Sequence, residues 1–135
     1  MTSKKNTDPL GDALLAYMLG EHNLELTVFS DISEEDVIPV DYLFRTVKEF
    51  PELEKKALAL CKGKVLDVGA GSGCHSLVLK EKGFDVKAID VSEGAATVMQ
   101  QRGLNSEQIN FFDVTKKYDT LLFLMNGVGI AGDLK

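Results

Sequence analysis

The sequence predicts an α/β fold built around a parallel sheet, and three observations support this prediction. Short stretches rich in β-branched residues recur from residue 64 onward. Stretches with helical spacing, each of about ten residues, lie between them. Glycines stand at several of the changeovers. Because parallel strands need long, usually right-handed crossover connections, this alternation predicts βαβ units.

Four strands and two helices are expected in this region. In chain order they are a strand at 64–68, a helix at 74–82, a strand at 84–90, a helix at 92–101, and strands at 108–114 and 118–125. Gly83 ends the first helix. Ser92 is suited to be the N-cap of the second helix, and Gly103 lies past its end.

Residues 1–62 are expected to form a helical cover, distinct from a sheet-forming unit at 63–135. The cover is predicted to contain a helix from Leu10 to Met18 that Gly20 ends, a short strand or extended stretch at 24–31, a helix within 39–50 and a helix after Pro51. The third of these elements is expected to bury Val40, Leu43, Phe44 and Val47, and the fourth Leu53, Ala57, Leu60 and Cys61.

Composition narrows the class of protein. With 135 residues, of which 44% are hydrophobic, the chain is expected to form one soluble domain. It has no apolar run of about eighteen residues that would cross a membrane, and no segment resembles a signal peptide. Cys61 and Cys74 lack metal-ligand spacing, which favours a cytoplasmic protein with free thiols. The net charge of −6 argues against dedicated nucleic-acid binding.

The stretch "VLDVGAGSG" (65–73) is the strongest functional signal. Glycines at 69, 71 and 73 allow a ligand to approach the backbone closely, beyond the carboxyl end of a parallel strand. The helix that follows directs its free N–H groups at the same crevice. The stretch therefore predicts a site for an adenosine-containing cofactor, either a dinucleotide or S-adenosylmethionine.

Glycine spacing and one acidic residue favour the second of these cofactors. The dinucleotide pattern G-x-G-x-x-G would need its third glycine at position 74, where this chain has Cys74. Asp67 precedes the loop by two residues, and a carboxylate there would repel a pyrophosphate. The same carboxylate suits a ligand that carries an ammonium and a sulfonium group.

Residues Val65 to about Gly129 resemble the class I S-adenosylmethionine-dependent methyltransferases. The resemblance rests on "VLDVGAGSG", "KAID", "QINFFDV" and "YDTLLFLMNG". It implies a Rossmann-like methyltransferase half-sheet with strand order 3-2-1-4, the first part of a seven-stranded sheet of order 3-2-1-4-5-7-6. It also implies S-adenosylmethionine as cofactor, S-adenosylhomocysteine as product, and methyl transfer to a small-molecule or protein substrate. No catalytic residue is assigned, because in-line transfer from a sulfonium depends chiefly on positioning.

The resemblance also implies roles for individual residues. The glycine loop, with Asp67, Gly69, Ala70, Gly71 and Gly73, is expected to hold the methionine part of the cofactor. Asp90 is expected to bind the ribose hydroxyls and Asp113 the adenine amino group. Val91 and Phe112 are expected to sandwich the adenine ring, and Asn126 to line the methyl-transfer site.

Other interpretations remain open for these residues. The glycines alone also occur in tight turns, Asp90 in helix caps, Asp113 at strand ends and Asn126 in turns. Two further function classes also compete: a nicotinamide-dependent Rossmann oxidoreductase and a non-catalytic cofactor-binding module.

Further contacts with the cofactor are expected outside the glycine loop. Cys74 and His75 begin the helix after the loop, where a thiol or imidazole can touch the ligand. From the N-terminal cover, Tyr17, Tyr42 and Arg45 are candidates, and Arg45 suits bidentate pairing with the cofactor carboxylate.

The chain ends soon after the fourth strand that we expect. By analogy with the seven-stranded family sheet, this strand would have an exposed apolar edge, which favours association with a second copy. The sequence therefore predicts the cofactor half of a methyltransferase that is inactive alone. It is expected to be either a fragment of a longer protein or a domain that gains its missing part by forming a homodimer through this edge.

Overall fold

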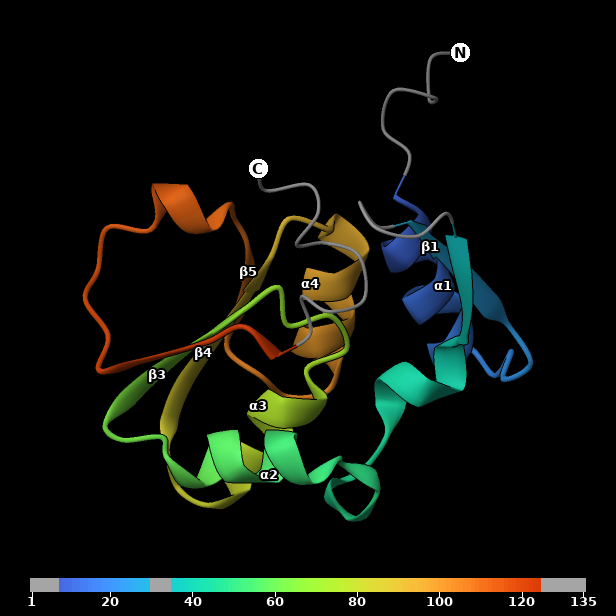
Figure 1. The fold of residues 1–135 in the computed structure, drawn as a ribbon. Coiled ribbons are helices and arrows are strands. Elements are labelled where there is room, and N and C mark those ends of the chain that lie inside the picture. The colour runs from blue at the N-terminus through green and yellow to red at the C-terminus, as the bar shows by residue number, and fades with distance from the viewer. Residues whose placement is uncertain (1–7, 30–34, 125–135) are drawn as a thin grey trace.

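A four-stranded parallel sheet lies at the centre of the protein (Figure 1). The computed structural model describes residues 8–29 and 35–124. The sheet consists of β3 (Lys64–Val68), β4 (Asp85–Asp90), β5 (Ser106–Gln108) and β6 (Thr120–Leu122). Its strand order is β5-β4-β3-β6. Numbered within the sheet alone, this is the expected order 3-2-1-4.

Two helices provide the crossovers between the first strands of the sheet. They are α3 (Cys74–Glu81) and α4 (Glu93–Gln101). Gly83 and Gly103 follow them with φ values of 92° and 87°, a conformation that glycine adopts without steric cost. The Ser92 side chain accepts a hydrogen bond from the Ala95 amide and so caps α4 as predicted.

The N-terminal part packs against this unit through α1 (Pro9–Met18). Figure 1 shows α1 beside α4, with a hairpin next to it. The remaining elements are β1 (Glu25–Phe29), β2 (Glu35–Pro39), the 3₁₀ helices η2 (Val40–Phe44) and η3 (Val47–Glu49), and α2 (Glu52–Ala59). Strand β2, which pairs antiparallel with β1, was not predicted. One apolar cluster joins Leu14 and Leu43 to Val65 and Leu79, so the hydrophobic core is continuous across residue 62. The division of the chain into a cover and a sheet-forming unit at that residue stays a prediction.

The single helix expected within residues 39–50 is wrong. Arg45 is extended, with φ −66° and ψ 157°, and separates η2 from η3. As a result, Val40 and Leu43 are buried, whereas Val47 is 42% exposed.

The buried face expected for α2 is right for Ala57 and Cys61, which pack in the core, and wrong for the two leucines. Leu53 and Leu60 are 77% and 75% exposed, and Leu58 is buried instead. The inward face contains Glu54, Leu58 and Cys61, at helical spacing. The inner side of this helix therefore carries a carboxylate, although the spacing of the apolar residues predicted that leucines would lie there.

The third strand of the sheet begins earlier than predicted. Strand β5 pairs with β4 from Ser106 to Gln108, and Gln108 lies opposite Asp90, the last residue of β4. The chain then turns into η4 (Phe111–Asp113), which the Asn110 side chain caps. The prediction of a strand at 108–114 is wrong, because β4 ends at Asp90 and has no further residue to pair with the chain beyond Gln108. The fourth strand is shorter than predicted, and Met125 lies outside the described residues.

The two faces of the sheet have different covers. Side chains alternate along a strand, so Val65, Asp67 and Val86 face α3 and α4. Leu66, Val68 and Ile89 face the other way, toward the segment that connects β5 to β6. Figure 1 shows this segment, coloured orange, across the sheet from α4. In the described part of the chain, no helix is long and apolar enough to span a membrane.

Candidate functional site at the glycine loop

The glycine loop has the backbone conformation that the sequence predicts. Gly69, Gly71 and Gly73 have φ values of 65°, 60° and 83°. Gly73 is the N-cap of α3, and a Cβ there would lie 2.4 Å from Leu104 Cδ1. This position therefore requires glycine for both its backbone angle and its packing.

Asp90 joins the end of β4 to this loop. Its Oδ2 accepts a hydrogen bond of 2.9 Å from the Gly71 amide, and its Oδ1 accepts one of 2.9 Å from the Ser92 amide. The side chain is buried, and burial raises the pKa of the carboxyl although these amides oppose the shift. The helix cap is Ser92, so Asp90 does not serve as the N-cap of α4.

Asp67 is a buried carboxylate with one free oxygen. Ser76 Oγ donates to Asp67 Oδ2 at 2.8 Å, whereas Oδ1 has no hydrogen-bond partner among the described residues. Burial raises the pKa of Asp67 to about 7. An unpartnered buried oxygen of this kind gains most from a nearby cationic group. Sequence reasoning identified Asp67 but missed Ser76.

The residues expected around the adenine are largely exposed. Val91 is 51% and Phe112 is 70% exposed, and Asp113 lies next to Phe112 in η4. Asn126 lies outside the described residues. The roles of Val91, Phe112 and Asp113 stay predictions.

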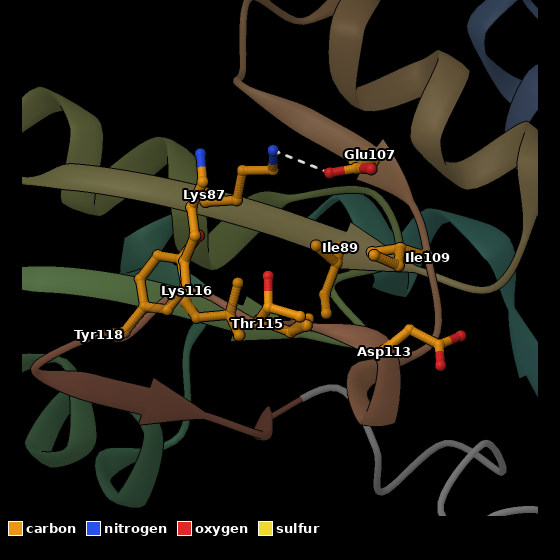
Figure 2. A pocket seen from close by; sticks show the side chains of 10 residues that line it. Lys87, Ile89, Glu107, Ile109, Asp113, Thr115, Lys116 and Tyr118 are labelled. Atoms are coloured by element: carbon orange, nitrogen blue, oxygen red, sulfur yellow. Dashed lines mark ion pairs between the residues drawn. The ribbon is translucent and has the colours of Figure 1, made fainter.

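A cavity of about 290 Å³ lies on the sheet face away from α3 and α4 (Figure 2). Leu66, Ile89 and Ile109 contribute apolar side chains to its lining. Lys87 and Glu107 form an ion pair of 2.9 Å beside it, and Asp113 also lines it. This cavity therefore places Asp113 on the opposite face of the sheet from Asp67.

Arg45, the predicted partner of a cofactor carboxylate, already holds a carboxylate of the chain. Its Nη2 donates to both oxygens of Glu54, at 2.7 and 2.9 Å. His75 Nε2 lies 2.8 Å from Glu54 Oε1. Although burial opposes the shift, the hydrogen bonds from His75 and Arg45 keep the pKa of Glu54 below its usual value. Sequence reasoning missed Glu54, since only the folded chain brings it to His75. The cofactor role of Arg45 stays a prediction.

Cys74 and His75, the first two residues of α3, are both buried. Burial raises the pKa of the Cys74 thiol to about 11 and lowers the pKa of His75. The thiol sulfur lies 3.9 Å from His75 Nδ1. Because a nucleophilic cysteine needs a depressed pKa, the raised pKa of Cys74 does not support covalent catalysis. In the described segments, no group of three or more His, Cys, Asp or Glu side chains is arranged to bind a metal ion.

Tyr17 and Tyr42 take part in contacts within the N-terminal cover. Tyr17 stacks on Phe44 with ring centroids 4.1 Å apart and donates to Asp41. The Arg45 guanidinium lies 4.1 Å from the centre of the Tyr42 ring. Their cofactor contacts stay predictions.

The family model for tellurite resistance protein TehB matches residues 32–125, more than half of the chain. The chain belongs to the TehB family. The structure also resembles the crystal structure of a SAM-dependent methyltransferase from Bacteroides fragilis in complex with S-adenosyl-L-homocysteine. The TM-score is 0.82 and the identity 47%, over 94% of this chain and 54% of that chain. The fold of this TehB-family chain is therefore the Rossmann-like methyltransferase fold that the sequence predicts.

Two curated relatives match shorter stretches of this TehB-family chain. An uncharacterized methyltransferase of Staphylococcus carnosus is 33% identical over 66 residues, 48% of this chain and 32% of that protein. The putative methyltransferase YqeM of Bacillus subtilis is 44% identical over 50 residues, 37% of this chain and 20% of that protein. The chain thus spans about half of the solved relative and a third or less of these two.

Proposed function

We propose that this chain binds S-adenosylmethionine at the glycine loop and forms the cofactor-binding portion of a methyltransferase. The observation that carries the proposal is the bond between the Asp90 carboxylate and the Gly71 amide. It brings an acidic side chain to the loop at the adjoining ends of two parallel strands, where ligands of open α/β sheets bind. The similarity to a protein that was crystallised with S-adenosyl-L-homocysteine supports the same cofactor.

The residues on both sides of the loop fit the parts of this cofactor. Asp90 can accept hydrogen bonds from two vicinal ribose hydroxyls. The free Oδ1 of Asp67 suits the ammonium group, and it disfavours the diphosphate of a nicotinamide dinucleotide. When bound, the cofactor supplies a methyl group already activated by a sulfonium. The protein then has to hold the acceptor in line with that group.

The adenine contacts of Val91, Phe112 and Asp113 belong to the same proposal, as do those of Asn126. The exposed side chains of Val91 and Phe112 leave apolar surface for a ring to cover. Arg45 would meet the cofactor carboxylate only after exchanging part of its pairing with Glu54.

The methyl acceptor is proposed to be a small molecule or a protein, and the location the cytoplasm. The net charge of −6 supports a partner other than nucleic acid, and the two free, buried cysteines fit a reducing compartment. A homodimer through β6 is also proposed, since among the described residues this strand pairs with β3 alone. Sedimentation at increasing protein concentration tests this, and a monomer throughout would contradict it.

Calorimetric titration with S-adenosylhomocysteine tests the proposed function. We expect the wild-type chain to bind it and NADH not to compete. Asp90→Ala should weaken binding about ten- to a hundredfold, the loss of a charge-assisted hydrogen bond. Asp85→Ala, an exposed change at the start of the same strand, should have no effect. Failure of the wild type to bind, or preferred binding of NADH, would overturn the proposal. A methyl-transfer assay would then separate an enzyme from a binding module.

A further inference from the structure

The Asp8 carboxylate joins the N-terminus of α1 to the turn beside the proposed ribose site. Asp8 is the N-cap of α1, and its Oδ1 accepts a hydrogen bond of 3.0 Å from the Gly11 amide. Its Oδ2 accepts two more, of 2.9 Å each, from Ser92 Oγ and from the Gly94 amide. These last two donors belong to the first turn of α4. One acidic side chain therefore serves the N-termini of two helices, where a negative charge is favoured.

The two helices approach each other closely at this point. A Cβ on Gly11 would lie 2.7 Å from the Gly94 Cα, and a Cβ on Gly94 would lie 2.5 Å from the Gly11 Cα. Such distances are too short for any side chain, so glycine at both positions permits the contact. The attachment is thus specified on both helices, which lie far apart in the sequence.

The same contacts lead directly to Asp90. Ser92, which donates to Asp8 through its hydroxyl, donates to Asp90 Oδ1 through its amide. Asp90 in turn accepts from the Gly71 amide in the glycine loop. A continuous hydrogen-bonded path therefore runs from α1 through Ser92 and Asp90 to the glycine loop. A change at Asp8 would alter the turn that orients the Asp90 carboxylate.

We propose that Asp8 is a positioning residue for the cofactor, which fixes the turn from Asp90 to Gly94 in the conformation that receives the ribose. This inference rests on the proposed function. Asp8 touches no part of the cofactor in this proposal and acts through Ser92 and Asp90. The N-terminal helix then contributes to the affinity for the cofactor without contacting it. The sequence predicted no residue of α1 that would orient Asp90.

A double-mutant cycle tests the inference with S-adenosylhomocysteine as the titrant. Asp8→Asn replaces one acceptor oxygen by an amide group, which cannot accept from its present donors. We expect this change to weaken binding about tenfold in the wild-type background. In the Asp90→Asn background, the same change should have little further effect, because coupled residues are not additive. Asp12→Asn alters an exposed carboxylate in the same turn of α1 and is the matched control.

Each outcome bears on a different claim. If the wild type does not bind, the proposed function fails before any variant is compared. If Asp8→Asn weakens binding equally in both backgrounds, or not at all, the inference is overturned while the function stands. If Asp8→Asn does not fold, Gly11→Ala takes its place in the cycle, since its Cβ would lie 2.1 Å from Asp8 Oδ2 and so displaces the carboxylate from its donors while keeping its charge. The same coupling to Asp90 is expected, and its absence would equally overturn the inference.

Discussion

The Asp90 carboxylate accepts a 2.9 Å hydrogen bond from the amide of Gly71, 19 residues earlier in the chain. This bond locks the glycine loop onto the end of β4. It requires Gly71 to present its amide with a φ of 60°, in the left-handed region that only glycine adopts readily. The loop is therefore shaped before any ligand arrives, a condition for tight binding at low entropic cost.

Gly71→Ala is expected to reduce cofactor affinity beyond its effect on stability. The matched control is Gly83→Ala, because Gly83 is exposed, follows α3 and has a φ of 92°. Each change should destabilise the fold by about 1–2 kcal/mol through backbone strain. Only Gly71→Ala should also weaken binding of S-adenosylhomocysteine, measured by calorimetry below the melting temperature of both variants. Equal affinities for the two variants would show that the loop does not contact the ligand.

The buried carboxyl of Asp67 should make stability depend on pH. An unfolded aspartate loses its proton near pH 3.8, whereas folded Asp67 keeps it until about pH 7. Between these values the folded state binds more protons, so the free energy of unfolding falls as pH rises. Asp67→Asn cannot ionise and should remove this fall. Urea unfolding from pH 4 to 8 should show that the free energy of unfolding of the variant rises, relative to that of the wild type, by roughly 4 kcal/mol. A constant difference across that range would contradict this assignment.

Cofactor binding should release a proton from Asp67. In the free protein at pH 6, Asp67 is mostly protonated, since burial raises its pKa to about 7. A bound ammonium group favours the ionised form, so binding should expel of the order of one proton at this pH and fewer as the pH rises above 7. Calorimetry in two buffers with different ionisation enthalpies measures this number. In the Asp67→Asn variant this proton release should disappear. A proton release that persists in the variant would mean that the ammonium group does not bind at Asp67.

The ion pair between Arg45 and Glu54 should stabilise the fold. Glu54→Gln leaves the buried guanidinium without a countercharge and weakens the contact to His75. A loss of about 3 kcal/mol in the free energy of unfolding is expected, as for other buried pairs that lose one partner. Glu52→Gln, an exposed change two residues earlier in α2, should alter stability by less than about 0.5 kcal/mol. Similar losses in both variants, measured by urea unfolding, would mean that the pair contributes little.

Features that depend on neighbouring residues could be predicted from the sequence. The glycine loop, β3, β4, α3 and α4 lie where expected, and so does the cap at Ser92. Their signals are local: periodic apolar residues, glycines at positive φ, and a side chain that bonds an amide three residues later. The strand order followed from the resemblance to a known family.

Features that depend on a distant partner could not be predicted. Strand β5 is short because β4 ends at Asp90, and the strand signal at 108–114 contains no such information. Glu54 is tolerated on the inward face of α2 because Arg45 pairs with its charge and His75 contacts it, and no spacing in the sequence reveals these partners.

The sequence alone thus determined the class of fold, the glycine loop and its two neighbouring acids, since periodicity and backbone freedom are properties of short segments. Only the tertiary structure decided how these acids are held. Asp8 reaches Ser92 across 84 residues, and burial, not residue type, makes the carboxyl of Asp67 a weak acid. Hydrogen bonding and desolvation depend on what surrounds a group, and folding alone assembles those surroundings.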